Sequence, residues 1–458
     1  MTTVNEVGLP VARTVEQRVA AGRDARDRLP LESLATCPDQ PLDVTALLDA
    51  EDQDRIQELV PLRYERMLAS PFAFYRGTAV VMAADLATHQ SSGLRAQLCG
   101  DAHLSNFGVF ATPERRLVLD LNDFDETLPG PFEWDVKRLA ASIALAGREN
   151  GHSPAQRAET VTAAMRAYRD AVRDFAQQGN LAVWYANLDI ERAMADLALD
   201  KTEHRRTVKT LEKARGRDHA RAVRKLAEVV DGRPRFRSEP PLLVPLRDLL
   251  PPVDADEVRR GLLDILDHYR STLPEDRRHL LDQFQLVDVA RKVVGVGSVG
   301  TRAWVLLMTG RDVDDPLLLQ AKEAGRSVLE PYCGASRHSS GGERVVAGQR
   351  LLQASSDIFL GWREGVGMDG GVRQHYVRQL WDAKASADVG AMEPRGLRLY
   401  SGLCAWTLAR GHARSGDRVA IASYLGKKDT FERALAAFAE SYADRVEQQY
   451  GDVRCARP

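Results

Sequence analysis

A strand-rich segment enclosed between two helical ones is the feature of this 458-residue sequence that most restricts its fold. Residues 286–390 carry glycines, β-branched runs and hairpin signals, which predict a small, mostly antiparallel sheet with one helix near 342–354. Residues 59–285 and 391–458 show the apolar spacing that is typical of helices. Residues 1–58 are polar and weakly periodic, which predicts a loose N-terminal arm with short helices. We therefore expect an α+β protein with a large helical lobe, completed by the C-terminal helices, and a small sheet lobe.

Charge and cysteine content exclude several classes of protein. The 63 basic and 65 acidic side chains leave a net charge of −2, so no excess positive field attracts nucleic acid. No apolar run approaches the roughly 18 residues that span a bilayer, and residues 1–30 lack the pattern of a secretory signal. The five cysteines are scattered and never spaced as CxxC, which argues against disulfides and cysteine-bound zinc. We expect a cytoplasmic protein with no nucleic-acid or membrane partner.

Two basic features have open interpretations. Residues 201–225 are rich in Lys and Arg but contain no aromatic residue, which nucleic-acid contacts use for stacking. A solvated helical face is the preferred interpretation, and a docking surface for an anionic substrate is the alternative. Arg76 lies beside aromatic residues in the string FYRG, where it either clamps a phosphate or packs.

The string CGDAHLSNFG, residues 99–108, carries the sharpest chemical signal. Asp101 is followed five residues later by Asn106, after a predicted strand at 94–98, which is the spacing of a phosphotransferase catalytic loop. A carboxylate there can accept the proton of an attacking hydroxyl, and an amide oxygen can bind Mg²⁺ without adding negative charge. We take Asp101 and His103 as candidate catalytic residues and Asn106 as a candidate metal ligand. A pair that only stabilises a turn is the alternative.

A second string, LVLDLNDFDE at residues 117–126, is an apolar strand that ends in a cluster of acids. Neighbouring carboxylates repel one another, so a buried cluster implies a bound cation. Oxygen ligands without cysteine or paired histidine favour Mg²⁺ over zinc. Asn106 and Asp123 lie 17 residues apart, the length of a hairpin, so we expect Asn106, Asp123 and Asp125 to form a metal site. An acidic surface turn is the alternative.

Two further polar residues lie at the ends of predicted helices. Asp135 opens the predicted helix 134–148, where it either caps the helix or holds the backbone amides of the catalytic loop. His412 ends a later helix, and we expect it to pack or cap rather than act as a general base.

A glycine-rich string, VVGVGSVGTR at residues 293–302, lies between two predicted strands. Glycines at this density permit a tight hairpin whose amides approach phosphates. A strand follows instead of a helix, which disfavours a dinucleotide fold and favours a hairpin that covers a nucleotide. Lys322 ends the next apolar strand, where a buried ammonium needs an anion such as an α- or β-phosphate. The candidate nucleotide-binding residues are Gly295, Gly297, Ser298, Val299, Gly300, Arg302, Lys322 and Arg378.

The carboxylate partner of Lys322 stays open between Glu330 and Glu343, with Gln349 as a neutral alternative. Arg378 falls in residues 376–380, a segment that we interpret as a connector between the lobes where an adenine would hydrogen-bond to the backbone.

Several strings resemble known families. GDAHLSNFG, DLNDFDETLPGPFEWDVKRLAAS, RKVVGVGSVGTRAWVLL, DIFLGW and LARGHARSGD look like the bacterial domain-of-unknown-function family 2252, over about residues 61–443. More remotely, GDAHLSN, NDFDE and WDVKRLA are similar to the catalytic core of aminoglycoside and choline kinases, which have the protein-kinase-like fold. This resemblance implies that Asp101 is the catalytic base and that Asn106 and Asp123 bind Mg²⁺.

The same resemblance puts Asp125 where those kinases usually carry glycine, and it gives Asp135 the role of bracing the catalytic loop. In such kinases the glycine-rich hairpin and its lysine precede the catalytic loop, whereas here residues 295–322 follow it. We therefore expect a circularly permuted protein-kinase-like fold, in which 286–390 cover the nucleotide. Residues 397–414 would form the helix that ordinarily leads into the catalytic loop.

The residues and the resemblance together predict a phosphotransferase that uses ATP and Mg²⁺ and acts on a hydroxyl of a small molecule. Two alternatives stay open. One is transfer of the nucleotidyl group (AMP) from the same ATP site, which would release pyrophosphate instead of ADP. The other is a catalytically inactive module that binds a nucleotide or a partner protein.

Overall fold

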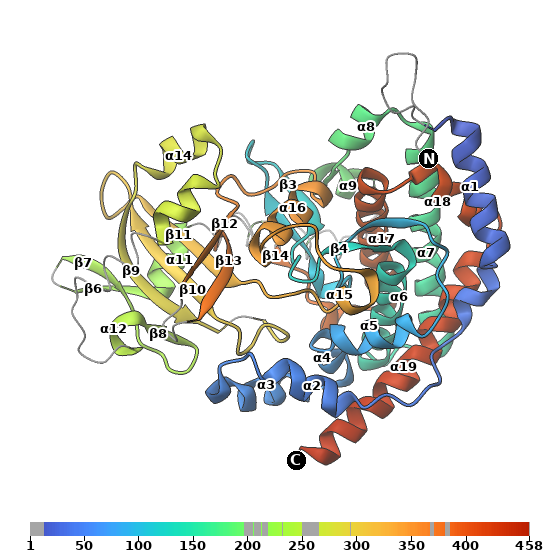
Figure 1. Cartoon of the computed structure of the whole chain (residues 1–458), viewed down its shortest axis with the longest axis horizontal. Helices are drawn as coiled ribbons and strands as arrows, with labels where there is room; N and C mark the ends of the chain where they lie inside the picture. Colours follow the sequence, from blue (N-terminus) through green and yellow to red (C-terminus); the bar gives the residue numbers. More distant parts are fainter. Residues whose placement is uncertain are drawn as a thin grey trace.

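The computed structural model describes residues 13–196, 219–230, 232–249, 265–293, 295–366, 371–380 and 385–457, with the single positions 205 and 212. It combines long helices with antiparallel sheet, so the fold is α+β. Figure 1 shows a sheet lobe at the left, a helical lobe at the right and short strands between them. Most of the basic segment 201–225 lies outside the described residues.

A six-stranded antiparallel sheet forms the sheet lobe, with its strands in the order β12-β13-β11-β10-β9-β8. Leu319 and Ala321 on one face of β11 pack in a cluster with Tyr269, whereas Leu318 on the other face packs in a cluster with Phe236. Both faces of the sheet are therefore covered, which buries β11 along most of its length. The elements of this lobe are α11 (His219–Leu226), β6 (Ala227–Val230), β7 (Arg233–Phe236), β8 (Leu243–Pro245), α12 (Leu246–Leu249), α14 (Glu275–Leu281), β9 (Gln285–Lys292), β10 (Ala303–Thr309), β11 (Pro316–Glu323), β12 (Gly361–Val366) and β13 (Val372–Gln379).

The sheet lobe begins earlier in the chain than residue 286, where the sequence analysis placed its boundary. β8 pairs with β9, and the residues on either side of β8 cover the two faces of the sheet. Their apolar side chains belong to this lobe because they complete its core. The predicted helix 342–354 is α16 (Gly341–Leu352), which contacts β12 and β13 on one side and the helical lobe on the other.

Long helices form the helical lobe, where α17 lies along α7, and α19 lies along α6 and α7. Phe132, Tyr168, His412 and Tyr424 pack ring against ring in its core. Every helix within the described ranges is too short or too polar to cross a bilayer. The helices are α1 (Val15–Arg28), α2 (Val44–Asp52), α3 (Val60–Met67), α4 (Pro71–Arg76), α5 (Ala79–Ala87), α6 (Phe132–Glu149), α7 (Pro154–Gln177), α8 (Asn180–Tyr185), α9 (Ile190–Asp196), α15 (Glu330–Cys333), α17 (Pro394–Ser415), α18 (Arg418–Leu425) and α19 (Thr430–Ala456).

The described part of the N-terminal arm is packed, whereas the sequence predicted a loose arm. α1 lies against α18, and a Cβ on Gly22 would come within 2.2 Å of the Ala420 carbonyl oxygen, so glycine permits this approach. At the end of α2, Asp52 and Glu51 pair with the buried Arg63, whose Nη2 is 2.5 Å from Glu51 Oε2. Buried leucines such as Leu34 and Leu48 also join the main core, so apolar packing, close approach at Gly22 and ion pairs together hold the arm in place.

Short strands between the lobes position the motifs. β1 pairs with β4, and β2 pairs with β3 in a four-stranded sheet of order β14-β2-β3-β5. The β2–β3 hairpin brings Asn106, before β2, next to Asn122, after β3, and the Asn122 amide donates to the Asn106 carbonyl at 2.9 Å. The strands are β1 (Arg95–Leu98), β2 (Phe107–Ala111), β3 (Leu117–Leu121), β4 (Leu128–Pro131), β5 (Leu188–Asp189) and β14 (Ala385–Ser386), and 3-10 helices lie at Leu31–Ala35, Gln57–Leu59, Leu104–Asn106 and Val389–Ala391.

Candidate active site

Asp135 holds the catalytic loop, residues 99–106, in place. Its carboxylate, in the first turn of α6, accepts hydrogen bonds from the Cys99 amide at 2.8 Å and the Gly100 amide at 3.0 Å. His412 Nε2 lies 3.3 Å from the same carboxylate, and Tyr168 Oη lies 2.7 Å from His412 Nδ1. Of the two roles that the sequence left open for Asp135, the structure shows the one that pins the loop. His412 packs against the carboxylate of Asp135.

Asp101 follows Gly100 and faces Arg138. Nε and Nη2 of Arg138 lie 2.8 and 2.7 Å from Asp101 Oδ1. The guanidinium also lies 3.8 Å from the centre of the Tyr75 ring, which fixes its position. Burial raises the pKa of Asp101, and the charge of Arg138 opposes that rise. Because Arg138 occupies Oδ1, Oδ2 is the oxygen that can accept a proton from a hydroxyl.

His103 and Arg76 are the other polar neighbours of Asp101. His103 Nε2 lies 3.5 Å from Asp101 Oδ2. Burial, together with the positive charges of Arg76 and Arg138, lowers the pKa of His103 well below its usual range, so its imidazole is neutral. In the part of the chain that the structure describes, no carboxylate forms an ion pair with Arg76, and its buried Nε has no hydrogen-bond partner. Two guanidinium groups therefore act on Asp101, and one of them is unpaired.

Asn106 links the catalytic loop to the acid loop, residues 122–126. Its Nδ2 donates to the Asp101 carbonyl at 2.9 Å and to the Asp123 carbonyl at 3.1 Å. Its Oδ1 accepts from the Asp123 amide at 2.7 Å. One lone pair of Oδ1 is therefore used, and a metal ion would bind through the other.

Lys322 joins the sheet lobe to the acid loop. Its ammonium lies 2.6 Å from Asp125 Oδ2 and 3.3 Å from Asp123 Oδ1, although nearly two hundred residues separate it from both. Burial lowers the pKa of Lys322, but the two carboxylates outweigh burial and hold that pKa well above its usual range. Three candidate residues from two distant parts of the sequence thus lie together, with the Lys322 ammonium within ion-pair distance of both carboxylates.

The two acid-loop carboxylates have different electrostatic surroundings. Burial raises the pKa of Asp123, and the nearby Asp125 raises it further. Burial also acts to raise the pKa of Asp125, but the closer Lys322 ammonium outweighs burial and lowers it. The two pKa shifts have opposite directions because the Lys322 ammonium lies closer to Asp125 than to Asp123.

The donor set fits Mg²⁺ bound together with phosphates. Among the described residues, no group of three or more His, Cys, Asp or Glu side chains forms a complete metal cluster. Mg²⁺ in phosphate-transferring sites is usually held by one or two carboxylates, with phosphate oxygens and water supplying the rest. Asp125 Oδ1 is buried and lacks a well-formed hydrogen bond to the described residues, although the Tyr376 side chain lies beside this carboxylate and acts to lower its pKa. A cation between Asp123 and Asp125 would satisfy that oxygen.

The glycine-rich turn, residues 295–302, closes over this site from the sheet lobe. Ser298 Oγ lies 3.5 Å from Asp125 Oδ2. Arg55 Nη1 donates to the carbonyls of Gly297 at 2.8 Å and Val299 at 2.6 Å, so the N-terminal arm holds the turn from outside.

Two positions in this turn need glycine. Gly295 and Gly300 have φ values of +67° and +89°, which side chains disfavour. Arg66 donates to the Gly295 carbonyl at 2.9 Å. Arg55 and Arg66 could not be predicted from the sequence, because no local pattern marks an arginine whose partner lies more than two hundred residues away.

The two arginines predicted to bind nucleotide have protein partners. Arg302 lies 3.3 Å from Glu323 and donates to the Asp54 carbonyl at 3.0 Å. Arg378 donates to the Asn122 carbonyl at 2.7 Å, which ties β13 to the acid loop. Arg378 therefore lies beside the site, while Arg302 faces the N-terminal arm.

The predicted partners of Lys322 bind elsewhere. Glu330 pairs with Arg326 at 3.1 Å, Glu343 lies 3.3 Å from His338, and Gln349 donates to Gln353. The partner is instead the acid loop itself, whose carboxylates already lie against the end of β11.

α16 contributes an arginine to the acid loop rather than a carboxylate to Lys322. Arg344 donates to the carbonyls of Asp125 and Thr127, each at 2.8 Å. Gly348, one turn further along, lies so close to Thr127 that a Cβ would come within 2.4 Å of its side chain. The helix therefore fixes the backbone of the loop that carries Asp123 and Asp125.

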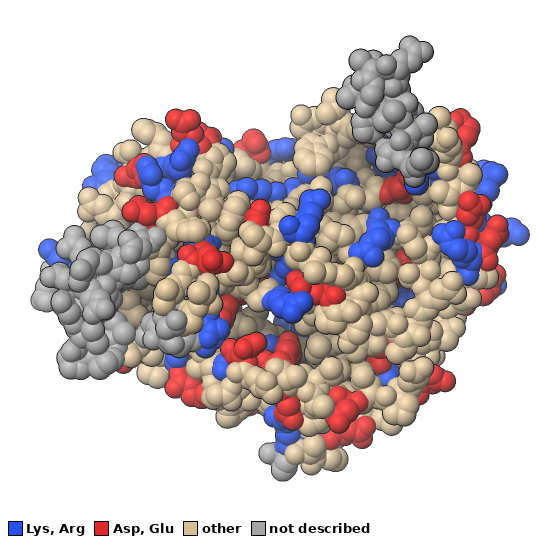
Figure 2. All heavy atoms as spheres, in the orientation of Figure 1, with Lys and Arg blue, Asp and Glu red and all other residues tan. Residues whose placement is uncertain are grey.

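The surface between the lobes is hollowed on the face shown in Figure 2, with acidic and basic side chains gathered at its edge. Fold and site thus define an α+β protein in which basic and acidic side chains of two lobes converge. The sequence model of a family described as "Uncharacterized protein conserved in bacteria (DUF2252)" matches residues 55–456, and the chain belongs to this family. No curated protein and no solved structure matches the chain.

Proposed function

We propose that this protein is an ATP- and Mg²⁺-dependent phosphotransferase that acts on a hydroxyl of a small molecule. The observation that carries the proposal is the contact of Lys322 with Asp123 and Asp125. This contact joins a lysine of the antiparallel sheet to the acid loop, in which Asp123 lies 17 residues after Asn106. Asn106 links the acid loop to the catalytic loop, which carries Asp101. Phosphotransferases of the kinase type use these side chains in these relations.

The arrangement of elements supports a permuted kinase-like fold. The glycine-rich turn connects β9 to β10, Lys322 ends β11, and α16 packs against the same sheet. In our proposal the sheet lobe covers the nucleotide. The catalytic loop, which follows β1, and the acid loop, which follows β3, form the other side of the site. In this proposal the parts are arranged in space as in ordinary kinases, although their order along the chain differs.

Each side chain has a defined role in the proposed reaction. Lys322 would exchange its carboxylate partners for the α- or β-phosphate of ATP, and Ser298 with its neighbouring amides would cover the phosphates. Asp123, Asp125 and the free lone pair of Asn106 would hold Mg²⁺, which neutralises phosphate charge. Asp101 Oδ2 would orient the acceptor hydroxyl and take its proton as the hydroxyl oxygen bonds to the γ-phosphorus and the bond from that phosphorus to the leaving ADP oxygen breaks.

The arginines beside Asp101 suit a transferring phosphoryl group. Arg138 is fixed by Asp101 and Tyr75, whereas Arg76 has no ion pair within the described ranges. A transferring phosphoryl group spreads negative charge over its oxygens, and a fixed cation stabilises that charge. Of the two interpretations of Arg76 that the sequence left open, we favour the phosphate clamp.

The test is ATP turnover by the purified protein with Mg²⁺ across a library of hydroxylated metabolites. We expect acceptor-dependent release of ADP. Release of pyrophosphate would instead indicate nucleotidyl transfer, and nucleotide binding without any product would indicate an inactive module.

Amino-acid substitutions test whether Asp101 acts as the general base. Asp101→Asn should lower turnover by about 10²- to 10⁴-fold while ATP binding persists, because general-base catalysis contributes in that range. Glu343→Gln is the matched control, since it removes a carboxylate that contacts His338 and not Lys322. Equal turnover in Asp101→Asn and Glu343→Gln would remove Asp101 as the base.

A further inference from the structure

A cavity of about 230 Å³ lies outside the candidate active site. We call it the side cavity. It is enclosed by the segment before and within the first 3-10 helix, the end of α5 and the first turns of α6. Its lining residues are Leu29, Ser33, Leu34, Thr36, Leu86, His89, Gln90, Glu133, Trp134 and Lys137.

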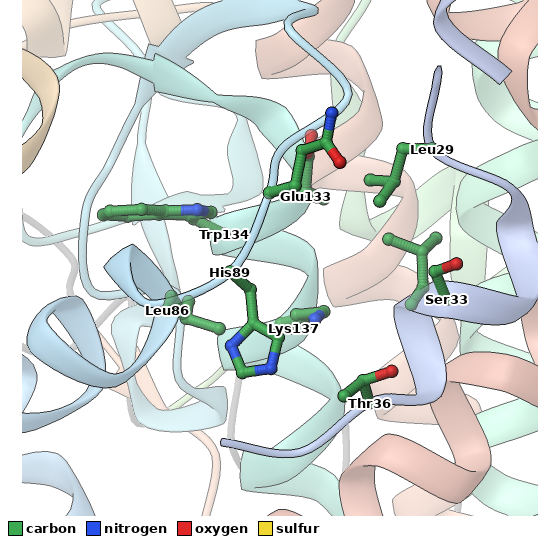
Figure 3. Close-up of a pocket in the computed structure, with 10 residues that line it drawn as sticks. Leu29, Ser33, Thr36, Leu86, His89, Glu133, Trp134 and Lys137 are labelled. Atoms are coloured by element: carbon green, nitrogen blue, oxygen red, sulfur yellow. The ribbon is translucent and has the colours of Figure 1, made fainter. Parts of the chain in front are cut away.

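Lys137 is the charged group of the side cavity. The residue is only 6% exposed, and its ammonium lies 4.4 Å from the centre of the Phe438 ring. Figure 3 shows its side chain between His89 and the segment that carries Ser33 and Thr36. Within the described ranges, no carboxylate forms an ion pair with Lys137 and no acceptor forms a hydrogen bond with it.

The charge of Glu133 acts to raise the pKa of Lys137 and so opposes burial, but no described carboxylate forms an ion pair with its ammonium. Glu133, one turn earlier on α6, accepts hydrogen bonds from the Ser92 amide at 2.6 Å and the Ser92 hydroxyl at 3.0 Å. Burial raises the pKa of Cys37 to about 11, so that thiol is neutral at physiological pH. Burial accordingly lowers the pKa of Lys137 to about 8. The cation still predominates at pH 7, and among the described residues no carboxylate of the cavity lies within ion-pair distance of it.

A buried ammonium without an anion is unfavourable, and a bound anion would offset that cost. The cavity is smaller than the 300–1,000 Å³ that is usual for pockets of drug-sized ligands. It therefore suits a small molecule rather than a nucleotide. The hydroxyls of Ser33 and Thr36 and the side chains of His89 and Gln90 offer further hydrogen bonds, while Trp134 offers an apolar wall.

We propose that the side cavity is a binding site for a small carboxylate, such as a short hydroxy or keto acid, whose carboxyl group pairs with Lys137. This site is separate from the proposed ATP site. Asp135 and Arg138 on the same helix contact the catalytic loop, whereas Lys137 faces the side cavity. The binding therefore does not depend on whether the protein transfers phosphate.

Protection from acylation tests the proposal on the unmodified full-length chain. An amine-acylating reagent is applied at pH 8 with sodium lactate or, at equal ionic strength, sodium chloride, and the modified peptides are quantified by mass spectrometry. We expect lactate to reduce modification of Lys137 at least threefold, while the exposed Lys427 and Lys428 react equally in both salts. Equal modification of Lys137 in both salts, or equal slowing at all three lysines, would overturn the proposal.

Variants provide a second measurement that does not use the reagent. Lactate should raise the midpoint of thermal unfolding of the wild-type chain and of Lys427→Met, but not that of Lys137→Met. Lys137→Arg keeps the charge and should keep part of the shift. An undiminished shift in Lys137→Met would show that the carboxylate binds elsewhere.

Discussion

Two buried lysines, Lys322 at the candidate active site and Lys137 in the side cavity, show how neighbours decide what a buried cation does. They are 2% and 6% exposed, so desolvation disfavours the charge of both. Lys322 has Asp125 and Asp123 within ion-pair distance, and its pKa is raised. Lys137 lies against the Phe438 ring and forms no ion pair with a described carboxylate, and burial lowers its pKa although the charge of Glu133 opposes that effect. Two lysines of similar burial thus differ in role. Lys322 links the two lobes, whereas Lys137 is the residue that we propose to bind an anion.

The largest expected effect is that of Lys322→Met. This change leaves Asp123 and Asp125 facing each other without the Lys322 ammonium, and removal of one partner from a buried pair costs about 3–5 kcal/mol. Because the Asp123 side chain is 43% exposed, we expect the lower end, a loss of about 3 kcal/mol in the free energy of unfolding. Urea denaturation followed by tryptophan fluorescence measures it. Lys322→Arg is the control, and a loss below about 1 kcal/mol in Lys322→Met would contradict the comparison.

The pH dependence of stability should have a different form for the two lysines. Above pH 8 the folded chain releases the Lys137 proton, while the unfolded chain keeps it up to about pH 10.5, so the contribution of Lys137 to stability rises with pH in this window. The pKa of Lys322 lies above 10.5, so its stabilising contribution is constant below that pH and is lost only above it.

We therefore expect the free energy of unfolding of the wild-type chain, relative to Lys137→Met, to rise between pH 8 and 10 by about 1 kcal/mol per pH unit. Relative to Lys322→Met it should stay constant over the same range. Denaturation curves at pH 7, 8, 9 and 10 give both differences. Parallel pH profiles for the two variants would mean that the two lysines titrate alike.

A smaller effect, of opposite sign to that of Lys322→Met, is expected for Lys137→Met at pH 7. The change removes an unpaired buried charge and keeps a side chain of similar length, although it loses the contact with the Phe438 ring. We expect the free energy of unfolding to rise by about 1 kcal/mol. Chemical denaturation without added carboxylates measures the change, and a clear loss of stability would show that Lys137 is satisfied within the protein.

The smallest expected effect is the coupling between the two sites. Lys137 lies on α6 and Lys322 on β11, and the contacts described for them share no partner residue. The double variant should therefore change stability by the sum of the single changes, within about 0.5 kcal/mol. A larger departure in a double-mutant cycle would indicate that α6 transmits a change between the side cavity and the acid loop.

The elements with strong local patterns could be predicted from the sequence. The apolar spacing of residues 134–148 corresponds to α6 at 132–149, and the predicted strand 94–98 corresponds to β1. The packing of the N-terminal arm could not be predicted, because it depends on contacts such as the hydrogen bond of Arg55 to Gly297, 242 residues away. β8 was missed for the same reason, since three residues carry too little periodicity to reveal their partner strand.

The site was partly visible in the sequence. A lysine at the end of an apolar strand signals a buried cation, which indicated Lys322, but nothing local indicated that its partners lie in the acid loop. The side cavity gave a misleading signal. Glu133 and Lys137 have the i, i+4 spacing of an exposed helical ion pair, yet both are buried and line the side cavity without forming an ion pair, because distant segments cover this face of α6.

The ion pairs at the end of α2 limit how far the chain can be shortened. The family match begins at residue 55, yet Glu51 and Asp52, which neutralise the fully buried Arg63, come before it. A chain trimmed to the family boundary would leave that guanidinium in the interior without a counter-ion, and it would place a new charged terminus at Arg55, which holds the glycine-rich turn. Truncations designed for crystallisation or screening should therefore start upstream of Val44, so that the whole of α2 is retained.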